Sequence, residues 1–363
     1  MTILFRYLLR EHVKFFMMCF AGLMTIYLVI DFFEKVRKFL DHDVDLFIML
    51  VYFLLKTPGI AFQMAPLAIL MATLLTLGMF SKNHEITAMR SCGISLSRVA
   101  APFLLFSLFV ALVLLGFSAV IIPLATTEGE YIRDTMIEGK IRPLQVKANR
   151  PWIQLGNGVL MNFDLVENRG RTIKGITLYQ LDSEVTLSEI TEAKDARYTA
   201  QGWTMHEGTR RRLLPNGGFL IDSFESEPLD WRQTPDDFFK WLSSESKEMT
   251  LAALGSYVDR LRKQGYKVSD FLTDYYGRIA FPFVCVVMAV VGLALSLRRS
   301  GLRTRGMALG IGQALAIGFL YWTTHSVGIA LGRSGALAPM MAGWIANVVF
   351  LSFGFYMYLH VKH

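Results

Sequence analysis

The chain has 363 residues, of which 53% are hydrophobic and 18% charged, and its formal net charge is +7. Its mean hydropathy is +0.39, and the apolar residues gather in the first ~125 and last ~85 positions, which excludes an ordinary soluble enzyme. The basic residues stand mostly at the ends of apolar runs and form no aromatic-interleaved patch. We therefore attribute the positive charge to the membrane and predict no nucleic-acid partner.

Six apolar segments are long enough to cross a bilayer, whose hydrocarbon core needs about 20 residues of helix. We expect them at 14–34, 57–80, 99–124, 277–297, 306–331 and 336–358. The first run continues to Asp31 without a small-residue cleavage site, which predicts a retained span rather than a signal peptide. The apolar stretch 45–56 is too short to cross and predicts a separate helix at the membrane edge.

Prolines, a histidine and the cysteines add detail to these spans. Pro66 and Pro282 lie within the second and fourth spans and predict kinks. His325, a lone histidine in the fifth span, either packs or bonds between helices, which we favour, or relays protons. Asp31 and Glu34 could suggest a proton path, but the sequence places no partner acid inside another span. None of the three cysteines lies in the middle of the chain, so we predict neither a disulfide nor a metal site.

The middle of the chain reads as a soluble β domain. Turn signals at 156–158, 201–202 and 215–218 each separate two strand-like runs, which predicts an antiparallel sandwich or jellyroll. An amphipathic pattern over 248–264 predicts a helix that returns the chain to the membrane. The expected fold class is a mainly α membrane protein of six transmembrane helices with an inserted antiparallel β-jellyroll. Its parts are 1–125 (three helices), 126–275 (the β domain and return helix) and 276–363 (three helices).

Lysine and arginine in the short loops predict the orientation, because cytoplasmic loops are enriched in them. With the N-terminus in the cytoplasm, that side receives eleven: Arg6, Arg10, Lys14, Lys82, Arg90, Arg98, Arg298, Arg299, Arg303, Arg305 and Lys362. The other side receives five: Lys35, Arg37, Lys38, Lys56 and Arg333. Both termini are therefore expected inside, with the β domain on the opposite side of the membrane.

Signatures of common enzyme chemistry are missing from the sequence. It contains no phosphate-binding GxxxxGK[ST] loop, no HExxH, no CxxC and no GxSxG. We therefore predict no catalytic residue and no bound cofactor.

The loop between the second and third spans carries a short helical pattern over 83–92. Glu85 near its start and Arg90 near its end agree with the helix dipole, and Gly93 fits a C-terminal cap. Ser95 is placed to cap the next span. The residues alone leave open whether this helix is a lever for a cytoplasmic partner or a solvated turn.

Five cations run against the positive-inside trend: Lys35, Arg37, Lys38, Arg133 and Arg278. They flank the first, third and fourth spans on the side opposite the termini. Cations at this level can hold the phosphates of a lipid whose tails stay in the bilayer. They can equally snorkel and pair with neighbouring acids, and the residues alone do not decide.

Several segments together resemble the LptF/LptG family, the permeases of the lipopolysaccharide exporter in Gram-negative inner membranes. They are RYLLRE (6–11), EITAMRSCGIS (85–95), GITLYQLD (175–182) and RSGLRTRGMALGIG (299–312). The resemblance spans essentially the whole chain. The β-domain segment, the glycine-rich fifth span and GALAPM (335–340) look more like the LptG branch than the LptF branch.

The resemblance implies a non-catalytic permease subunit of an ABC-type exporter that takes lipopolysaccharide from the outer leaflet of the inner membrane. It implies as partners a second permease (LptF), a cytoplasmic ATPase dimer (LptB) that uses the ATP, single-span LptC and the periplasmic bridge LptA. It also makes the loop helix a coupling helix that docks on the ATPase, with Glu85, Thr87, Met89, Arg90 and Gly93. Both termini would be cytoplasmic and the jellyroll periplasmic.

The same resemblance assigns the outer cations to lipopolysaccharide. Arg37, Lys38 and Arg133 match positions where the family places cations near the lipid phosphates, and Lys35 and Arg278 join them. The chain departs from the pattern at Asp31, where LptG-type proteins can carry a lysine, and Lys35 is the candidate substitute.

Two further interpretations stay open. The chain could be the LptF-type paralogue, or a membrane-anchored sensory protein whose extracytoplasmic β domain binds a ligand without transport. A sensor rarely needs six spans, and a secondary transporter would need intramembrane ionisable pairs that the sequence lacks.

Overall fold

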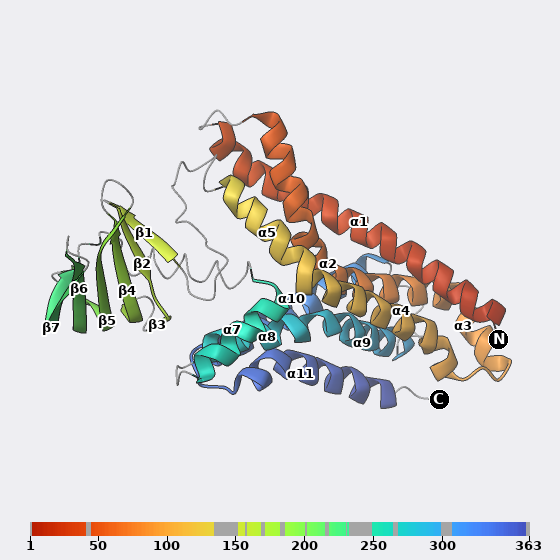
Figure 1. Ribbon diagram of the computed structural model, residues 1–363. Coiled ribbons are helices and arrows are strands. Elements are labelled where there is room, and N and C mark those ends of the chain that lie inside the picture. The colour runs from red at the N-terminus through yellow and green to blue at the C-terminus, as the bar shows by residue number, and fades with distance from the viewer. Residues whose placement is uncertain are drawn as a thin grey trace. The chain divides into compact units, whose positions relative to one another are not determined.

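The computed structural model describes residues 2–40, 45–133, 152–156, 158–167, 171–181, 186–199, 202–214, 218–229, 231, 249–263, 268–298 and 307–360. The chain divides into two compact units. The helical unit comprises Met1–Arg133, Glu248–Gly255 and Ser269–His363, and the β unit comprises Asp134–Lys247 and Ser256–Val268. The predicted fold class, a helical membrane protein with an antiparallel β domain inserted in the middle, is confirmed (Figure 1).

Long helices make up most of the helical unit. In chain order they are α1 (Thr2–Leu40), α2 (Leu46–Lys82), the short α3 (Glu85–Ser91), α4 (Leu96–Gly116) and α5 (Ile122–Tyr131). After the strands come α7 (Leu251–Lys263), of which only the first turn belongs to the helical unit, then α8 (Ser269–Ala280), α9 (Val284–Arg298), α10 (Met307–Arg333) and α11 (Pro339–Leu359). A π-helical turn, Phe117–Ile121, joins α4 to α5, and a 3₁₀ turn, Phe281–Phe283, joins α8 to α9.

Six segments among the described residues are long and apolar enough to cross a membrane, as the sequence predicted. They are Ile3–Val36, Leu46–Lys82, Leu96–Tyr131, Ser269–Leu297, Gly310–Arg333 and Pro339–Leu359. Most of them begin earlier or end later than the apolar runs, because polar residues at each end stay helical. The third continues to Tyr131, so the predicted boundary at 125 falls inside a helix.

The separate interfacial helix predicted over 45–56 is wrong. These residues are the first third of α2, which runs without interruption through Pro58 and Pro66. Apolar residues continue on both sides of Pro58, and the one charged residue of the stretch inside α2, Lys56, is neutralised by Asp31 of α1. Since nothing polar is left to stop the helix, the short run and the second span form one element.

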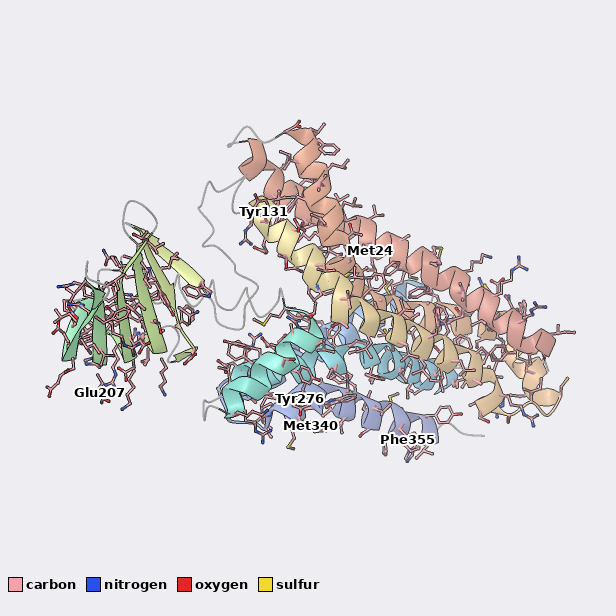
Figure 2. The ribbon with its side chains drawn as sticks, in the orientation of Figure 1. Met24, Tyr131, Glu207, Tyr276, Met340 and Phe355 are labelled. Carbon is pink, nitrogen blue, oxygen red and sulfur yellow. The ribbon has the colours of Figure 1, made fainter. Side chains whose placement is uncertain are left out.

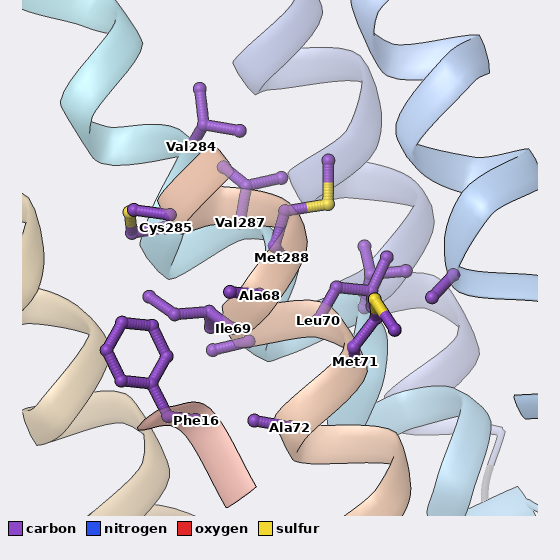
Figure 3. Packing of buried hydrophobic residues seen from close by; sticks show 14 of the residues in the cluster. Phe16, Ala68, Ile69, Leu70, Met71, Ala72, Val284, Cys285, Val287 and Met288 are labelled. Carbon is purple, nitrogen blue, oxygen red and sulfur yellow. The ribbon is translucent and has the colours of Figure 1, made fainter. Parts of the chain in front are cut away.

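The core of the helical unit forms around α2 and α9. Within their most apolar windows 72% and 61% of residues are buried, against 17% in α1 and α10. Figure 3 shows the contact: Ala68, Ile69 and Leu70 of α2 face Cys285 and Met288 of α9. Small residues such as alanine let transmembrane helices approach closely. The outer helices α1, α4, α10 and α11 pack around this pair and expose apolar side chains such as Met340 and Phe355 (Figure 2).

At Pro282, where the sequence predicted a kink, the 3₁₀ turn Phe281–Phe283 causes a break in the α-helical hydrogen bonding between α8 and α9. Pro282 has no N–H to donate to the Arg278 carbonyl. The Val284 N–H donates to the Phe281 carbonyl instead of the Ala280 carbonyl. The Asn347 side chain of α11 donates to the Ala280 carbonyl at 2.8 Å, and the Ser118 hydroxyl lies 3.5 Å from that of Arg278. Side chains of other helices thus satisfy the two carbonyls that the break releases.

The β unit contains a seven-stranded antiparallel sheet. Its strands are β1 (Trp152–Gly156), β2 (Val159–Asn162), β3 (Leu165–Glu167), β4 (Thr172–Leu181), β5 (Leu187–Thr199), β6 (Gly202–Leu213) and β7 (Phe219–Leu229). The order is β1-β2-β4-β5-β6-β7, with β3 also paired to β4, so neighbours largely follow chain order. The three predicted turn signals lie between β1 and β2, β5 and β6, and β6 and β7, as expected.

Close packing of α10 on α8 and α11 gives a test of the helical unit. A Cβ on Gly332 would lie 2.5 Å from the Ala342 Cβ and 2.8 Å from Thr273, whereas one on Gly312 of the same helix would meet nothing within 4 Å. We expect Gly332→Val to destabilise the protein by about 1–3 kcal/mol through overpacking. The measurement is the melting temperature of the purified protein in detergent. Gly312→Val is the matched control, and equal melting temperatures for the two variants would contradict this packing.

Candidate functional site

The helical unit presents two ends with different chemistry. One end gathers α3, the start of α1, the end of α2 and the start of α4 (Figure 1). The other end gathers the end of α1, the start of α2 and the end of α5, where Tyr131 is labelled in Figure 2. The predicted coupling residues lie at the first end, and Lys35 and Arg133 lie at the second.

The loop helix α3 is attached to the bundle by one face. Ile86 and Met89, three residues apart, are buried against Leu8 of α1, Phe80 of α2 and Phe103 of α4. On the other face Thr87 and Arg90 are exposed. Of the five predicted coupling residues, Met89 is therefore an anchor of the helix rather than part of a surface that a partner can touch.

The end of α3 is fixed by its backbone. Gly93 has φ +76°, a conformation that costs other residues energy, and so allows Ile94 to donate to the Met89 carbonyl while Gly93 itself donates to Arg90. Ile94 also packs on the cluster that contains Met89. The predicted C-terminal cap at Gly93 is confirmed. At the next helix, Ser95 is the N-cap residue of α4, but its hydroxyl contacts Ser97 and makes no capping bond.

Glu85 at the start of α3 is held by two donors. The Tyr7 hydroxyl of α1 donates to one carboxylate oxygen at 3.0 Å, and the Asn83 side chain donates to the other at 3.2 Å. The Tyr7 ring packs against Phe80 with centroids 5.6 Å apart. The carboxylate is thus oriented by α1 as well as by its own loop.

A buried carboxylate, Asp31, lies at the other end of the unit and pairs with two lysines. Its side chain is only 8% exposed. Lys35, one turn further along α1, donates to Asp31 Oδ1 at 2.6 Å. Lys56 of α2 donates to the same oxygen at 2.6 Å and to Oδ2 at 2.8 Å. We call Asp31, Lys35 and Lys56 the lysine–aspartate cluster, which carries a net charge of +1 when all three are ionised.

Tyr52 connects this cluster to the end of α5. Its ring lies 5.9 Å from Lys35 Nζ, and its hydroxyl lies close enough to interact electrostatically with both Glu130 and Arg133. Arg133 is ion-paired with Glu130, one turn earlier on its helix. Cations from α1, α2 and α5 therefore gather at one end of the helical unit.

The structure does not bring all five predicted outer cations together. Arg278 lies beside Ser118, fifteen residues before Arg133 on a continuous helix, which places the two about 20 Å apart. Its guanidinium donates to the Met249 carbonyl at 2.7 Å. The backbone of Arg278 therefore lies apart from that of Arg133, and the assignment of Arg278 to the lipopolysaccharide site stays a prediction. The side chains of Arg37 and Lys38 lie outside the described residues.

Sequence reasoning missed Lys56 and Tyr7 as site residues. Lys56 was counted only as a loop charge, yet a lysine surrounded by apolar residues needs a counter-ion, and Asp31 is an acid at the end of the apolar run of the preceding helix. That complementarity was the available signal. Nothing in the local pattern of Tyr7 could have connected it to Glu85, because 78 residues separate them.

Two other candidate positions carry less chemistry. The His325 ring stacks with the Tyr321 ring, with centroids 6.1 Å apart, and its centroid lies 5.5 Å from that of the Phe281 ring. These contacts agree with a packing role. A shallow hollow of about 610 Å³ crosses β4–β7. Its lining includes the acids Asp164, Glu192, Glu207 and Glu225, which would repel a phosphate-bearing ligand.

Together these features define a polytopic membrane protein with a short helix at one end that exposes one face, and with several cations at the other end. The model of the lipopolysaccharide export system permease LptF/LptG family matches residues 6–360. The chain belongs to this family.

Relatives within the family are distant but cover the chain. It is 24% identical to LptG of Haemophilus influenzae over 85% of both chains. It is 24% identical to LptF of Escherichia coli K12 over 96% of this chain and 93% of that protein. It is 21% identical to LptG of the same strain over 96% of this chain and 95% of that protein. These identities do not separate the LptG branch from the LptF branch.

Proposed function

We propose that this protein is the LptG-type half of a lipopolysaccharide exporter, with a second, LptF-type permease as the other half. Membership of the permease family over residues 6–360 is the observation that carries this proposal. In it the chain itself binds no cofactor and hydrolyses no ATP. The ATP is used by a cytoplasmic LptB dimer, and LptC and LptA receive the lipid.

The proposed orientation puts α3 and both termini in the cytoplasm and the β unit in the periplasm. The support is the excess of lysine and arginine in the loops on the α3 side. Three free cysteines provide a probe, because Cys92 at the end of α3 is exposed while Cys19 and Cys285 are buried.

A membrane-impermeant maleimide tests this orientation. In spheroplasts we expect it to label Ser223→Cys, an exposed position of β7, and not Cys92. In inverted inner-membrane vesicles we expect the reverse, with Cys92→Ser as the control for background labelling. Labelling of Cys92 from outside intact spheroplasts would reverse the topology.

We further propose that α3 docks on the ATPase through its exposed face, with Glu85 as the charged contact and Thr87 and Arg90 beside it. Ile86 and Met89 then transmit the motion, because they tie α3 to α1, α2 and α4. A carboxylate that faces a cation in an interface is worth about 2–5 kcal/mol when its removal leaves the partner unpaired.

Charge reversal at Glu85 tests the docking proposal. We expect Glu85→Lys to lower transport at least tenfold while the chain still inserts, either by loss of ATPase co-purification or by ATP hydrolysis without transport. Tyr7→Phe is the control, because it removes the internal hydrogen bond and keeps the charge. Equal losses in both variants would mean that Glu85 only fastens α3 to α1, and normal transport by Glu85→Lys would make it a solvated residue.

We propose that the cations at the other end hold the phosphates of lipopolysaccharide. Lys35 and Arg133 lie at the ends of membrane-spanning helices, where the charged part of a lipid whose chains remain in the bilayer is expected. Lys56 extends this set, and Arg37 and Lys38 stay candidates. A partly desolvated charge-assisted bond contributes about 1.5–3 kcal/mol, so several are needed for firm capture.

Removing two cations tests the lipid site while the buried Asp31 carboxylate keeps one lysine partner. We expect Lys35→Gln with Arg133→Gln to reduce photo-crosslinked lipopolysaccharide per folded transporter about tenfold or more, since Lys56 still pairs with Asp31. Each single change should have a smaller effect. The control is Lys194→Gln with Arg211→Gln, two exposed cations of the β unit. Unaltered loading in a stably assembled double variant would remove these residues from the site.

The β unit is proposed to receive the lipid next. One side of its sheet carries buried apolar residues that include Met161, Phe163, Ile173, Trp203 and Met205. An apolar interior of this kind suits acyl chains, whereas the acidic hollow on β4–β7 does not.

A further inference from the structure

The lysine–aspartate cluster is an anion site that already contains an anion. Asp31 is the most buried member, since its side chain is 8% exposed while those of Lys35 and Lys56 are 26% and 31% exposed. Both ammonium groups donate to the same oxygen, Asp31 Oδ1, at 2.6 Å. The carboxylate therefore lies beneath two cations that face the more open side.

The position of Asp31 Oδ1 is where a phosphate oxygen would sit. A phosphate oxygen accepts from ammonium groups at the same distances as a carboxylate oxygen. The cluster keeps one unit of positive charge after Asp31 has neutralised one lysine, so a phosphate dianion is still attracted to it. The two lysines also come from different helices, so a change of their partner changes the contact between α1 and α2.

We propose that Asp31 is an exchangeable internal counter-anion: it holds Lys35 and Lys56 in the empty transporter, yields them to a lipid phosphate, and recaptures them when the lipid leaves. This inference deepens the proposed lipid site and rests on it. When only a fraction of the molecules is in the binding-competent state, the apparent affinity for the ligand is reduced by that fraction. Asp31 thus lowers the affinity for phosphate and makes release possible.

Simple bonding between helices gives a different expectation. If Asp31 only ties α1 to α2, its removal loosens the site and lipid binds equally or less well. If Asp31 competes with phosphate, its removal makes lipid bind more tightly. The sign of the change in affinity therefore distinguishes the two roles.

The experiment uses the full chain purified with its co-purifying subunits in phosphatidylcholine nanodiscs, titrated with lipopolysaccharide. We expect Asp31→Asn to lower the dissociation constant about tenfold and to slow lipid release. Glu34→Gln, the same charge change at an exposed position of α1, is the matched control and should leave binding unchanged. Equal or weaker binding by Asp31→Asn would overturn the exchange.

A second comparison guards against misfolding, because Asp31→Asn leaves two cations without their counter-ion. In a Lys56→Gln background only one lysine remains, and adding Asp31→Asn should again tighten lipopolysaccharide binding. No tightening in this background would overturn the exchange as well.

Two further titrations distinguish a lipopolysaccharide phosphate from an ordinary headgroup phosphate. They also distinguish failure of the exchange proposal from failure of the exporter proposal. Titration with phosphatidylglycerol tests the ordinary headgroup phosphate, and dephosphorylated lipid A should lose the Asp31→Asn effect. Retention of the effect with dephosphorylated lipid A would overturn the exchange. If the wild-type complex binds no lipopolysaccharide but Asp31→Asn tightens phosphatidylglycerol binding, the exporter proposal fails while the exchange stands.

Discussion

Backbone groups inside a bilayer have no water to bond with, and the helical unit depends on how this chain meets that constraint. Most of the described spans satisfy it with helical hydrogen bonds, interrupted in the second at Pro58 and Pro66 and modified in the third by a π-helical turn. The fourth contains Pro282, which releases carbonyl oxygens at Arg278 and Ala280. Ser118 and Asn347 supply the missing donors from two other helices, and Tyr321 donates in turn to Asn347 at 2.6 Å. These hydrogen bonds therefore connect the junction of α8 and α9 to three other parts of the unit: the turn between α4 and α5, then α11, and through α11 also α10.

The lack of water inside the bilayer also restricts where charged side chains can lie. A carboxylate at membrane depth is costly unless it is paired, and Asp31 is paired twice. Because one partner comes from α2, the pairing also joins α1 to α2 and neutralises Lys56 within its apolar helix. The residue that departs from the charge pattern expected from the resemblance is thus the shared partner of Lys35 and Lys56.

The two ends of the unit are connected by the packing of α1 and α2. Tyr7 and Leu8 of α1 contact the α3 region, and Asp31 and Lys35 of the same helix form the lysine–aspartate cluster. A movement of α3 would reach the cluster along two continuous helices. This arrangement suits an exporter better than a sensor, whose ligand-binding domain would not need a charged site on the spans themselves.

The sequence by itself determined the six spans, the inserted antiparallel domain, the short helix over 83–92 with its Gly93 cap, and the family. These follow from run length, alternation and local backbone preference, which act within a few residues. It could not give the union of 45–56 with the second span, the separation of Arg278 from Arg133, the inward face of Met89, or the bond from Tyr7 to Glu85. Each of these depends on which residues of other helices lie opposite, since a charge or a donor is satisfied by its neighbour in space. Only the tertiary structure decided that Asp31, read from the sequence as a departure in the charge pattern, is the shared partner of Lys35 and Lys56.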